Sequence, residues 1–191
     1  MAERLPKRVR EKYLAQMAAQ EIRKHMTRVS DALIRKHSGP WPSGTTQDSL
    51  SKRSGSGIRS IKNFTVRMSP EAAEGVWRLR GYMNFHEKGG VIRAKNAQYL
   101  TIPLPAALDS RGVPRHASAR DWRDTFIRES RRGNLIIFQK RGADIVPLYV
   151  LKKSVRIPPR LGMRKALIED RPTLRRNLQD RVKELLKGTR R

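Results

Sequence analysis

The stretch Phe85–Leu108 constrains the backbone more than any other part of the chain. Its Gly89-Gly90 pair can adopt positive φ at no steric cost, so we expect a sharp turn there. Residues 99–104 (YLTIPL) then carry the β-branched and aromatic side chains typical of a strand. Prolines stop this strand, because proline has no amide hydrogen for a ladder. We predict that 99–104 is an inner strand of a sheet and that 86–98 is the loop leading into it.

Strand patterns occur on both sides of this segment. Upstream, 61–68 and 76–82 have the alternation expected of a hairpin. Downstream, we expect a short helix over 119–125 that Ser118 caps. Three more strands follow, at 126–129, 135–140 and 145–155. The predicted fold class is α+β, with one twisted antiparallel sheet of about five or six strands flanked by a long N-terminal helix and C-terminal helices.

The N-terminal helix is predicted over 6–37, with Pro6 in its first turn. Its apolar side chains recur at three- and four-residue spacing, which indicates one buried stripe. Thr27 or Ser30-Asp31 would mark a break, since such residues also cap helices. The helix packs along its own domain or extends as an arm onto a neighbouring subunit. The stripe consists of Leu14, Met17, Ala18, Ile22, Met26, Val29 and Leu33.

The C-terminal part is predicted as two helices. A short one covers 161–169, and Asp170 caps a second one that has Pro172 in its first turn. Its apolar stripe is expected at Leu174, Leu178, Val182 and Leu185 or Leu186.

Four segments along the chain follow from these patterns. They are a helical arm at 1–37, a flexible Gly/Ser/Pro loop at 38–60, an antiparallel β domain at 61–160 and C-terminal helices at 161–191. Trp41 is the only large apolar residue of the loop, and we expect it to pack against its own domain. The alternative is that it anchors a partner.

The net charge is +26, from 43 Lys and Arg against 17 Asp and Glu. Such a charge attracts polyanions, so nucleic acid or an acidic protein surface is the expected counterpart. Aromatic residues are sparse, and no DNA-reading motif occurs, so DNA contacts should be to phosphates and independent of sequence. The predicted contact residues are Arg128, Arg131, Arg132, Lys140, Arg141, Lys152, Lys153, Arg156 and Arg160.

No residue pattern points to catalysis. Cysteine is absent, which excludes disulfides and a thiolate nucleophile. The histidines lack metal-binding spacing, and no phosphate loop, dinucleotide motif or nucleophile elbow occurs. The sequence also lacks a signal peptide and an apolar run of membrane-spanning length. We therefore expect no enzymatic activity, no cofactor, no metal and no membrane partner.

The segment HEKGGVIRAKNAQYLTIPLP resembles small virion proteins of long-tailed bacteriophages, the tail-completion or neck components of the minor tail protein Z type. In that group a Gly-Gly turn leads through a Lys/Asn-containing loop into a strand ending Pro-Leu, and a later Val-x-Ile-Pro motif leads into a C-terminal helix. The order of elements agrees over roughly 60–191. The matching residues are His86, Gly89, Gly90, Lys95, Leu100, Ile102, Pro103, Leu104, Pro147-Leu148-Tyr149 and 155–160, with Pro158 at the corner.

The resemblance implies a structural role at the head–tail junction. The protein would form a ring with copies of itself and contact the tail terminator or tail-tube protein, the head connector or portal-side protein, and the phage DNA end. It would be assembled in the host cytoplasm and reside in the virion. One alternative is a sequence-independent nucleic-acid-binding protein outside any virion. Another is a nuclease that uses His86 and Glu87.

Overall fold

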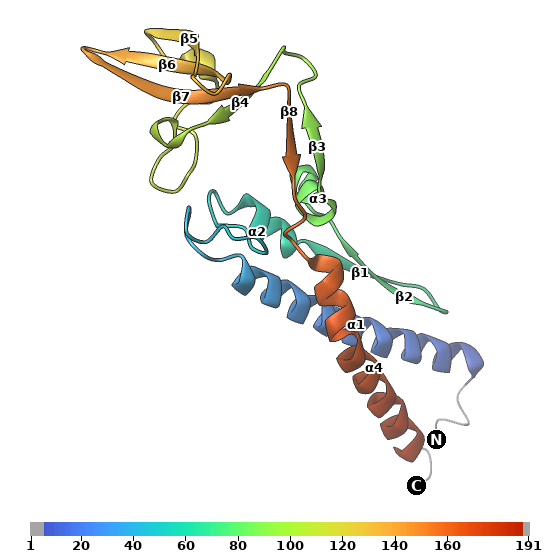
Figure 1. Ribbon diagram of the computed structural model, residues 1–191. Coiled ribbons are helices and arrows are strands. Elements are labelled where there is room, and N and C mark those ends of the chain that lie inside the picture. Colours follow the sequence, from blue (N-terminus) through green and yellow to red (C-terminus); the bar gives the residue numbers. More distant parts are fainter. Residues whose placement is uncertain (1–5, 189–191) are drawn as a thin grey trace. The chain divides into compact units, whose positions relative to one another are not determined.

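The computed structural model describes residues 6–188, which form two compact units of helices and antiparallel strands (Figure 1). One unit combines 6–37, 56–83 and 161–188, and the other combines 38–55 and 84–160. The predicted α+β class is confirmed, with a long helix near each end of the chain. Each unit is assembled from segments far apart in sequence, whereas the four predicted segments follow chain order.

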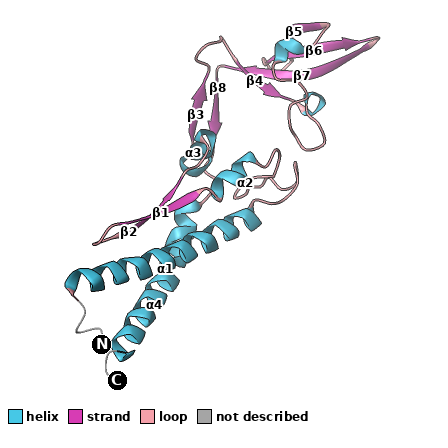
Figure 2. Cartoon of the chain, turned by 180° about the vertical axis from the view of Figure 1, so that it is seen from behind, coloured by secondary structure: helices cyan, strands magenta, loops and turns pink. Residues whose placement is uncertain are grey.

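The first unit is built around two long helices, which Figure 2 shows together with a strand pair. Helix α1 spans Lys7–Lys36 and α4 spans Met163–Gly188. The short helix α2 (Ser56–Ile61) precedes the hairpin strands β1 (Phe64–Met68) and β2 (Ala73–Trp77). The hairpin predicted at 61–68 and 76–82 therefore exists, but both of its strands are shorter than predicted. Its second strand, β2, starts three residues earlier than predicted.

The core of this unit lies where α1 meets the hairpin. Met26 and Val29 of α1 are buried, as is Ile61 at the end of α2. Gly75 faces α1 so closely that a Cβ there would overlap the sulfur of Met26, so only glycine lets β2 approach the helix. Trp77 closes the core by donating its indole N–H to the Ile61 carbonyl oxygen at 3.1 Å.

Helix α1 runs without the break predicted at Thr27 or Ser30-Asp31. Ser30 is buried and donates its hydroxyl to the Ile61 carbonyl at 3.0 Å, so it serves the core and caps nothing. The predicted apolar stripe is correct from Met17 to Leu33, but Leu14 is 44% exposed and Ala15 is buried in its place. The stretch 15–33 of the helix packs along its own unit, which is the first of the two predicted positions.

The two predicted C-terminal helices are one continuous helix with Pro172 in its interior. Proline removes the hydrogen bond to the carbonyl of Ile168 and disfavours the helical conformation of the residue before it. Pro172 and Ile168 are both exposed, so water can donate a hydrogen bond to the carbonyl oxygen of Ile168. Packing on α1 on both sides of the proline keeps the helix continuous, and Asp170 is a contact residue instead of a cap.

His37 closes the C-terminal end of α1 and links it to the start of the last segment. Its ring is buried, and Nε2 donates to the carbonyl oxygen of Leu161 at 2.9 Å. Burial lowers the pKa of His37 below its usual 6.5, although the bond to Leu161 opposes part of this effect. The folded protein therefore holds this ring neutral at pH values where the unfolded chain is already protonated.

We accordingly predict that the free energy of unfolding falls as the pH drops from 7 towards 5. The contribution of His37 is complete above pH 6.5 and is lost as the pH approaches its folded pKa, with a slope of at most about 1.4 kcal/mol per pH unit. Urea titrations across this range should show that His37→Gln flattens the slope. His116→Gln is the control, because His116 is exposed. Equal slopes for wild type and His37→Gln would refute the prediction.

The second unit contains two sheets. Strands β3 (Gly90–Arg93) and β8 (Ser154–Ile157) form an antiparallel ribbon. A four-stranded antiparallel sheet has the order β4-β7-β6-β5. Helix α3 (Gly81–Lys88) begins in the first unit and ends in the second. The sheet strands are β4 (Leu100–Pro103), β5 (Thr125–Glu129), β6 (Leu135–Arg141) and β7 (Asp144–Lys152), and two short 3-10 turns precede β5 at Pro105–Ala107 (η2) and Ala119–Asp121 (η3).

Several predictions for this unit need correction. The single sheet of five or six strands is divided into a four-stranded sheet and two separate two-stranded ribbons. The strand at 99–104 is an edge strand, which agrees with the missing amide of its proline. The loop at 86–98 contains the end of α3 and all of β3. The strand at 145–155 divides at Lys153 into β7 and β8, which join different sheets.

Other local predictions for this unit are confirmed. The hairpin of β5 and β6 lies where its two strands were predicted. Ser118 caps the following 3-10 turn through a capping box with Asp121, although the helix is a single turn. Trp41 packs over Gly112, where a Cβ would come within 2.5 Å of the indole ring. Arg53 lies over the same ring and donates to the Gly112 carbonyl at 3.1 Å, so the irregular segment 38–55 is held to its own unit.

Candidate partner and nucleic-acid interface

The nine predicted contact residues all belong to the second unit, but the structure distributes them over different surfaces. Arg131 and Arg132 are exposed in the turn between β5 and β6. Lys153 is exposed between β7 and β8, and Arg156 is exposed on β8. Arg160 follows β8 and is half-buried. The remaining four, Arg128, Lys140, Arg141 and Lys152, lie on strands of the four-stranded sheet.

Strand register decides which face of the sheet each of these side chains occupies. Directly paired residues share a face, and neighbours along a strand alternate between faces. Ile137 pairs with Tyr149, and both lie on one face. Tyr149 is buried under the segment that carries Trp122, whose indole N–H donates to the Tyr149 hydroxyl at 3.1 Å. We call this side the covered face, and Arg141 belongs to it because its guanidinium lies over the Trp122 ring at 6.0 Å.

The opposite side, which we call the open face, is apolar but uncovered. Phe126 pairs with Phe138, and their rings stack with centroids 5.7 Å apart. Phe126 is 38% exposed, and no apolar side chain of this face is buried. The apolar members of the open face are Leu100, Ile102, Phe126, Ile136, Phe138, Ile145, Pro147 and Val150.

Basic side chains border the open face. Arg128 pairs with Ile136, Lys140 follows Phe138 by two residues, and Lys152 pairs with Leu100. Lys152 also donates to the side-chain oxygen of Asn134. The two acidic residues of the four strands, Glu129 and Asp144, alternate onto the other face. The open face therefore combines an apolar centre with positive charge and no carboxylate.

The structure brings together the two parts of the motif that resembles phage neck proteins. Arg160 donates its backbone N–H to the carbonyl oxygen of His86 at 2.6 Å. Gly90 of β3 pairs with Ile157 of β8, immediately before the Pro158 corner. Gly89 has a φ of +70°, and a Cβ there would lie 3.0 Å from the Cδ atom of Pro159. The Gly-Gly turn and the proline corner are thus one packed element, while Pro103 and Leu104 lie apart from it at the end of β4.

We predict that Gly89→Ala lowers the free energy of unfolding by about 1–2 kcal/mol, because a left-handed φ is unfavourable for any residue with a Cβ. The close approach of Pro159 adds to the cost. Gly81→Ala is the matched control, since a Cβ at Gly81 meets nothing within 4 Å and φ there is not positive. Urea denaturation of the two variants measures the difference, and equal stability would contradict the assigned role of the turn.

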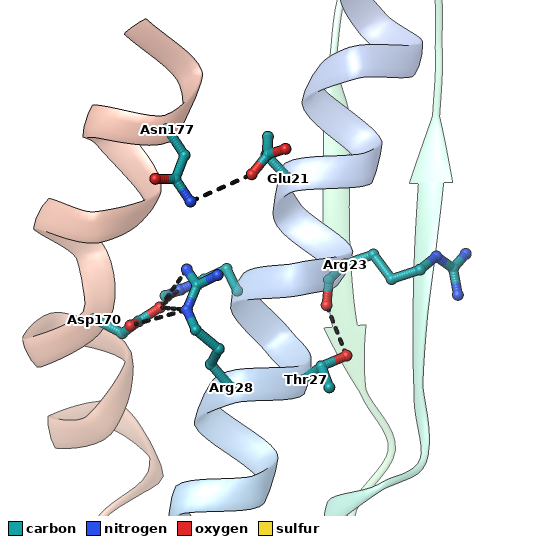
Figure 3. Close-up of polar contacts among 7 residues, drawn as sticks. Glu21, Arg23, Thr27, Arg28, Asp170 and Asn177 are labelled. Carbon is teal, nitrogen blue, oxygen red and sulfur yellow. Dashed lines mark hydrogen bonds and ion pairs between the residues drawn. The ribbon is translucent and has the colours of Figure 1, made fainter. Parts of the chain in front are cut away.

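A cluster of charged side chains joins α1 to α4 and was not predicted (Figure 3). Asp170 accepts a hydrogen bond from His25 Nδ1 at 2.5 Å and three from Arg28, the shortest at 2.8 Å. About one helical turn before His25 on α1, Glu21 accepts hydrogen bonds from Lys24, Asn177 and Arg181. Arg28 contacts Asp170, and Glu21, earlier on α1, contacts Asn177, later on α4. The two helices therefore run antiparallel.

Both carboxylates of this cluster are held ionised. Burial alone would raise the pKa of Asp170, but the hydrogen bonds and charges of Arg28 and His25 together keep that pKa below its usual value. The pKa of Glu21 is lowered mainly by its hydrogen bond to Lys24, and Arg181 adds to the effect. Every carboxylate oxygen of the pair accepts at least one hydrogen bond. We therefore assign the cluster to helix pairing, since its groups are fully used in holding one another.

The sequence did contain a signal for this cluster. Glu21, His25 and Arg28 recur at four and three residues and so share one side of α1. Asp170, Asn177 and Arg181 recur at seven and four residues on α4. Each stripe has an acidic residue at one end and a basic residue at the other, so the two can pair in antiparallel order, but nothing local shows that they face each other.

The nuclease alternative depends on two neighbouring residues of one helix. His86 and Glu87 both lie in the last turn of α3 and are half-buried. Within residues 6–188, no three His, Asp or Glu side chains gather into a potential metal site. No helix in the same range is long and apolar enough to cross a membrane.

A scan of protein-family models and searches of curated proteins and of solved structures find no match to this chain.

Proposed function

We propose that this protein is a structural component of a phage tail or neck, which completes the tail and joins it to the head connector as part of a ring. Its basic surface would face DNA or acidic neighbours. The observation that carries the proposal is the unusual amount of surface that the chain leaves uncovered. The resemblance of residues 86–104 and 155–160 to neck proteins specifies which kind of assembly we propose.

The accessible surface of the chain is 14156 Å². A compact protein of 22.0 kDa exposes only about 9,300 Å², and two compact halves that do not touch expose about 11,200 Å². An allowance of about 1,500 Å² for the eight residues outside the described range accounts for only half of the remaining excess. The units therefore carry more surface than monomeric domains of their size, as expected of a subunit that is covered by neighbours in an assembly.

Exposed apolar residues support the same proposal. Val9, Tyr13 and Leu14 lie on the first turns of α1 and are each more than 40% exposed. Their helix thus packs on its own unit over most of its length but offers an apolar end to a neighbouring copy. On the second unit, Phe126 of the edge strand β5 is 38% exposed and stacks on Phe138 of the neighbouring strand. Contiguous apolar surface of this kind typically marks contact with another protein.

Mass spectrometry and immunogold microscopy of purified particles test the proposal. We expect peptides of this protein in a stoichiometric ratio to the portal protein and gold label at the head–tail junction. Detached tails and heads, purified separately, show which side of the junction carries it. Particles that lack the protein, from cells that contain it, would refute a virion role.

The second candidate, a sequence-independent nucleic-acid-binding protein outside a virion, is favoured by the exposed arginines of the β5–β6 turn. If phosphates are the partner, duplex DNA of any sequence should bind equally well. With about eight phosphates neutralised, log K should fall with log salt with a slope of about −7. Arg131, Arg132 and Arg141 replaced together by Ala should flatten this slope if the hairpin is the contact.

The matched control for that measurement is the replacement of Arg171, Arg175 and Arg176 by Ala. These residues are exposed on α4, so the variant loses the same three charges from the other unit. Fluorescence anisotropy at several salt concentrations gives both slopes. An affinity that does not depend on salt, or a strong preference for one sequence, would exclude phosphate-based binding.

A further inference from the structure

We infer that the open face of the four-stranded sheet docks a protein partner whose surface is apolar at its centre and acidic around it. This inference rests on the proposed function, because it takes the partner to be another component of the head–tail junction. It goes beyond that function by naming the surface, its residues and the chemistry of what covers it.

The first reason is the character of the face itself. An antiparallel sheet with one face in water normally carries polar side chains on that face. Here the water-facing side presents Ile102, Val150, Ile136 and the stacked Phe126–Phe138 pair instead. None of these side chains is buried by the described residues, whereas Tyr149 and Leu151 of the covered face are. The sheet therefore buries apolar side chains at the centre of the covered face, whereas none of the apolar side chains of the open face is buried.

The second reason is the size of the face. Four strands about 4.8 Å apart make it roughly 15 Å wide, and the paired residues extend for a similar length. An area of this size matches the apolar centre of a protein–protein interface and is smaller than a complete interface. A partner would extend beyond this centre and meet the basic residues that border it.

The third reason is charge, which separates the classes of occupant. Arg128, Lys140 and Lys152 lie on this face and no carboxylate does, so two copies placed face to face would bring like charges together. Duplex DNA would satisfy the basic side chains but would leave the aliphatic centre against water or phosphate. Single-stranded bases stack on aromatic rings, and here the aliphatic side chains outnumber the two phenylalanines. An acidic protein surface with an apolar centre satisfies both parts of the face.

Site-specific photo-crosslinking tests this inference in the cells that make the protein during particle assembly. The full-length chain carries p-benzoylphenylalanine in place of Phe126, and a second version carries it in place of Ile127. These neighbours lie on the same edge strand and are 38% and 61% exposed, but they point to opposite faces. We expect position 126 to crosslink to an acidic protein, identified by mass spectrometry, and position 127 to give at most a minor product.

Affinity measurements with the purified partner then test whether individual residues of the open face contribute to binding. Phe126→Asp and Arg128→Glu should each weaken the affinity at least tenfold, whereas Ile127→Asp should leave it unchanged. Thermal unfolding of each variant checks folding, and Phe126→Tyr, which keeps the aromatic ring, should retain binding. Partner affinity that is equally weakened by the Ile127→Asp variant would overturn the assignment of the open face.

The remaining outcomes each decide the inference. A crosslink from position 126 to a second copy of this chain, to nucleic acid or to nothing at all would overturn it. A crosslink to an acidic protein that is absent from purified particles would support the docking surface and refute the virion role. The two proposals can therefore fail separately.

Discussion

Under the proposed head–tail joining function, deletion of the gene from the phage that encodes it should leave DNA-filled heads and full-length tails that do not join. A ring that bridges the tail end and the head connector is needed only at the last step, so both substructures should assemble without it. Electron microscopy of the lysate and the titre of infectious particles measure the result. The expected titre is close to zero, and expression of the protein from a plasmid should restore it.

His86→Ala in the same phage separates the structural proposal from a nuclease. The backbone carbonyl of His86, not its ring, accepts the hydrogen bond from Arg160, so the substitution leaves that contact in place. We assign the side chain no chemical step and expect nearly normal titres. Normal infectivity after deletion would refute the structural role. A non-infectious His86→Ala phage with intact particles would instead favour the enzymatic alternative.

Asp170→Ala should lower the free energy of unfolding by about 2 kcal/mol. Removing one partner of a fully buried ion pair costs about 3–5 kcal/mol, and an exposed pair is worth about 0–1 kcal/mol. The side chain of Asp170 is 22% exposed and that of Arg28 is 36% exposed, so the pair falls between these limits. The substitution also leaves His25, which is buried, without its carboxylate partner.

Asp180→Ala is the matched control on the same helix. Its ion pair with Lys183 is exposed on both sides, and we expect a change below about 0.5 kcal/mol. Urea denaturation at pH 7 compares the two variants. If Asp170→Ala and Asp180→Ala are equally stable, the buried cluster does not hold the helices together.

The stability difference caused by Asp170→Ala should also depend on pH. The pKa of Asp170 is lower in the folded protein than in the unfolded chain, so its contribution is complete above about pH 4. The contribution is lost as the pH falls through the folded pKa, and the difference between wild type and variant should shrink there. A difference that stays constant to low pH would show that the carboxylate charge is not its source.

Local sequence determined the parts of this protein whose interactions are local. Runs of β-branched and aromatic residues located β5 and β6 within one residue at each end. Ser118 caps a turn because its hydroxyl can reach an amide two residues on. Gly89 turns the chain because it lacks a Cβ, and Pro103 lies at a sheet edge because it lacks an amide hydrogen. Each of these properties belongs to one residue and its immediate neighbours.

Tertiary structure alone decided which elements pair and which charges meet. Residues 145–155 look like one strand, yet they divide between two sheets because β4 and β3 supply different partners for the two halves. Asp170 before Pro172 has the local pattern of a helix cap, but its carboxylate binds Arg28, which is 142 residues away in sequence. The basic residues of one hairpin likewise divide between the two faces of a sheet, because strand register sets the direction of each side chain. Pairing and register depend on contacts between distant segments, and no local pattern contains that information.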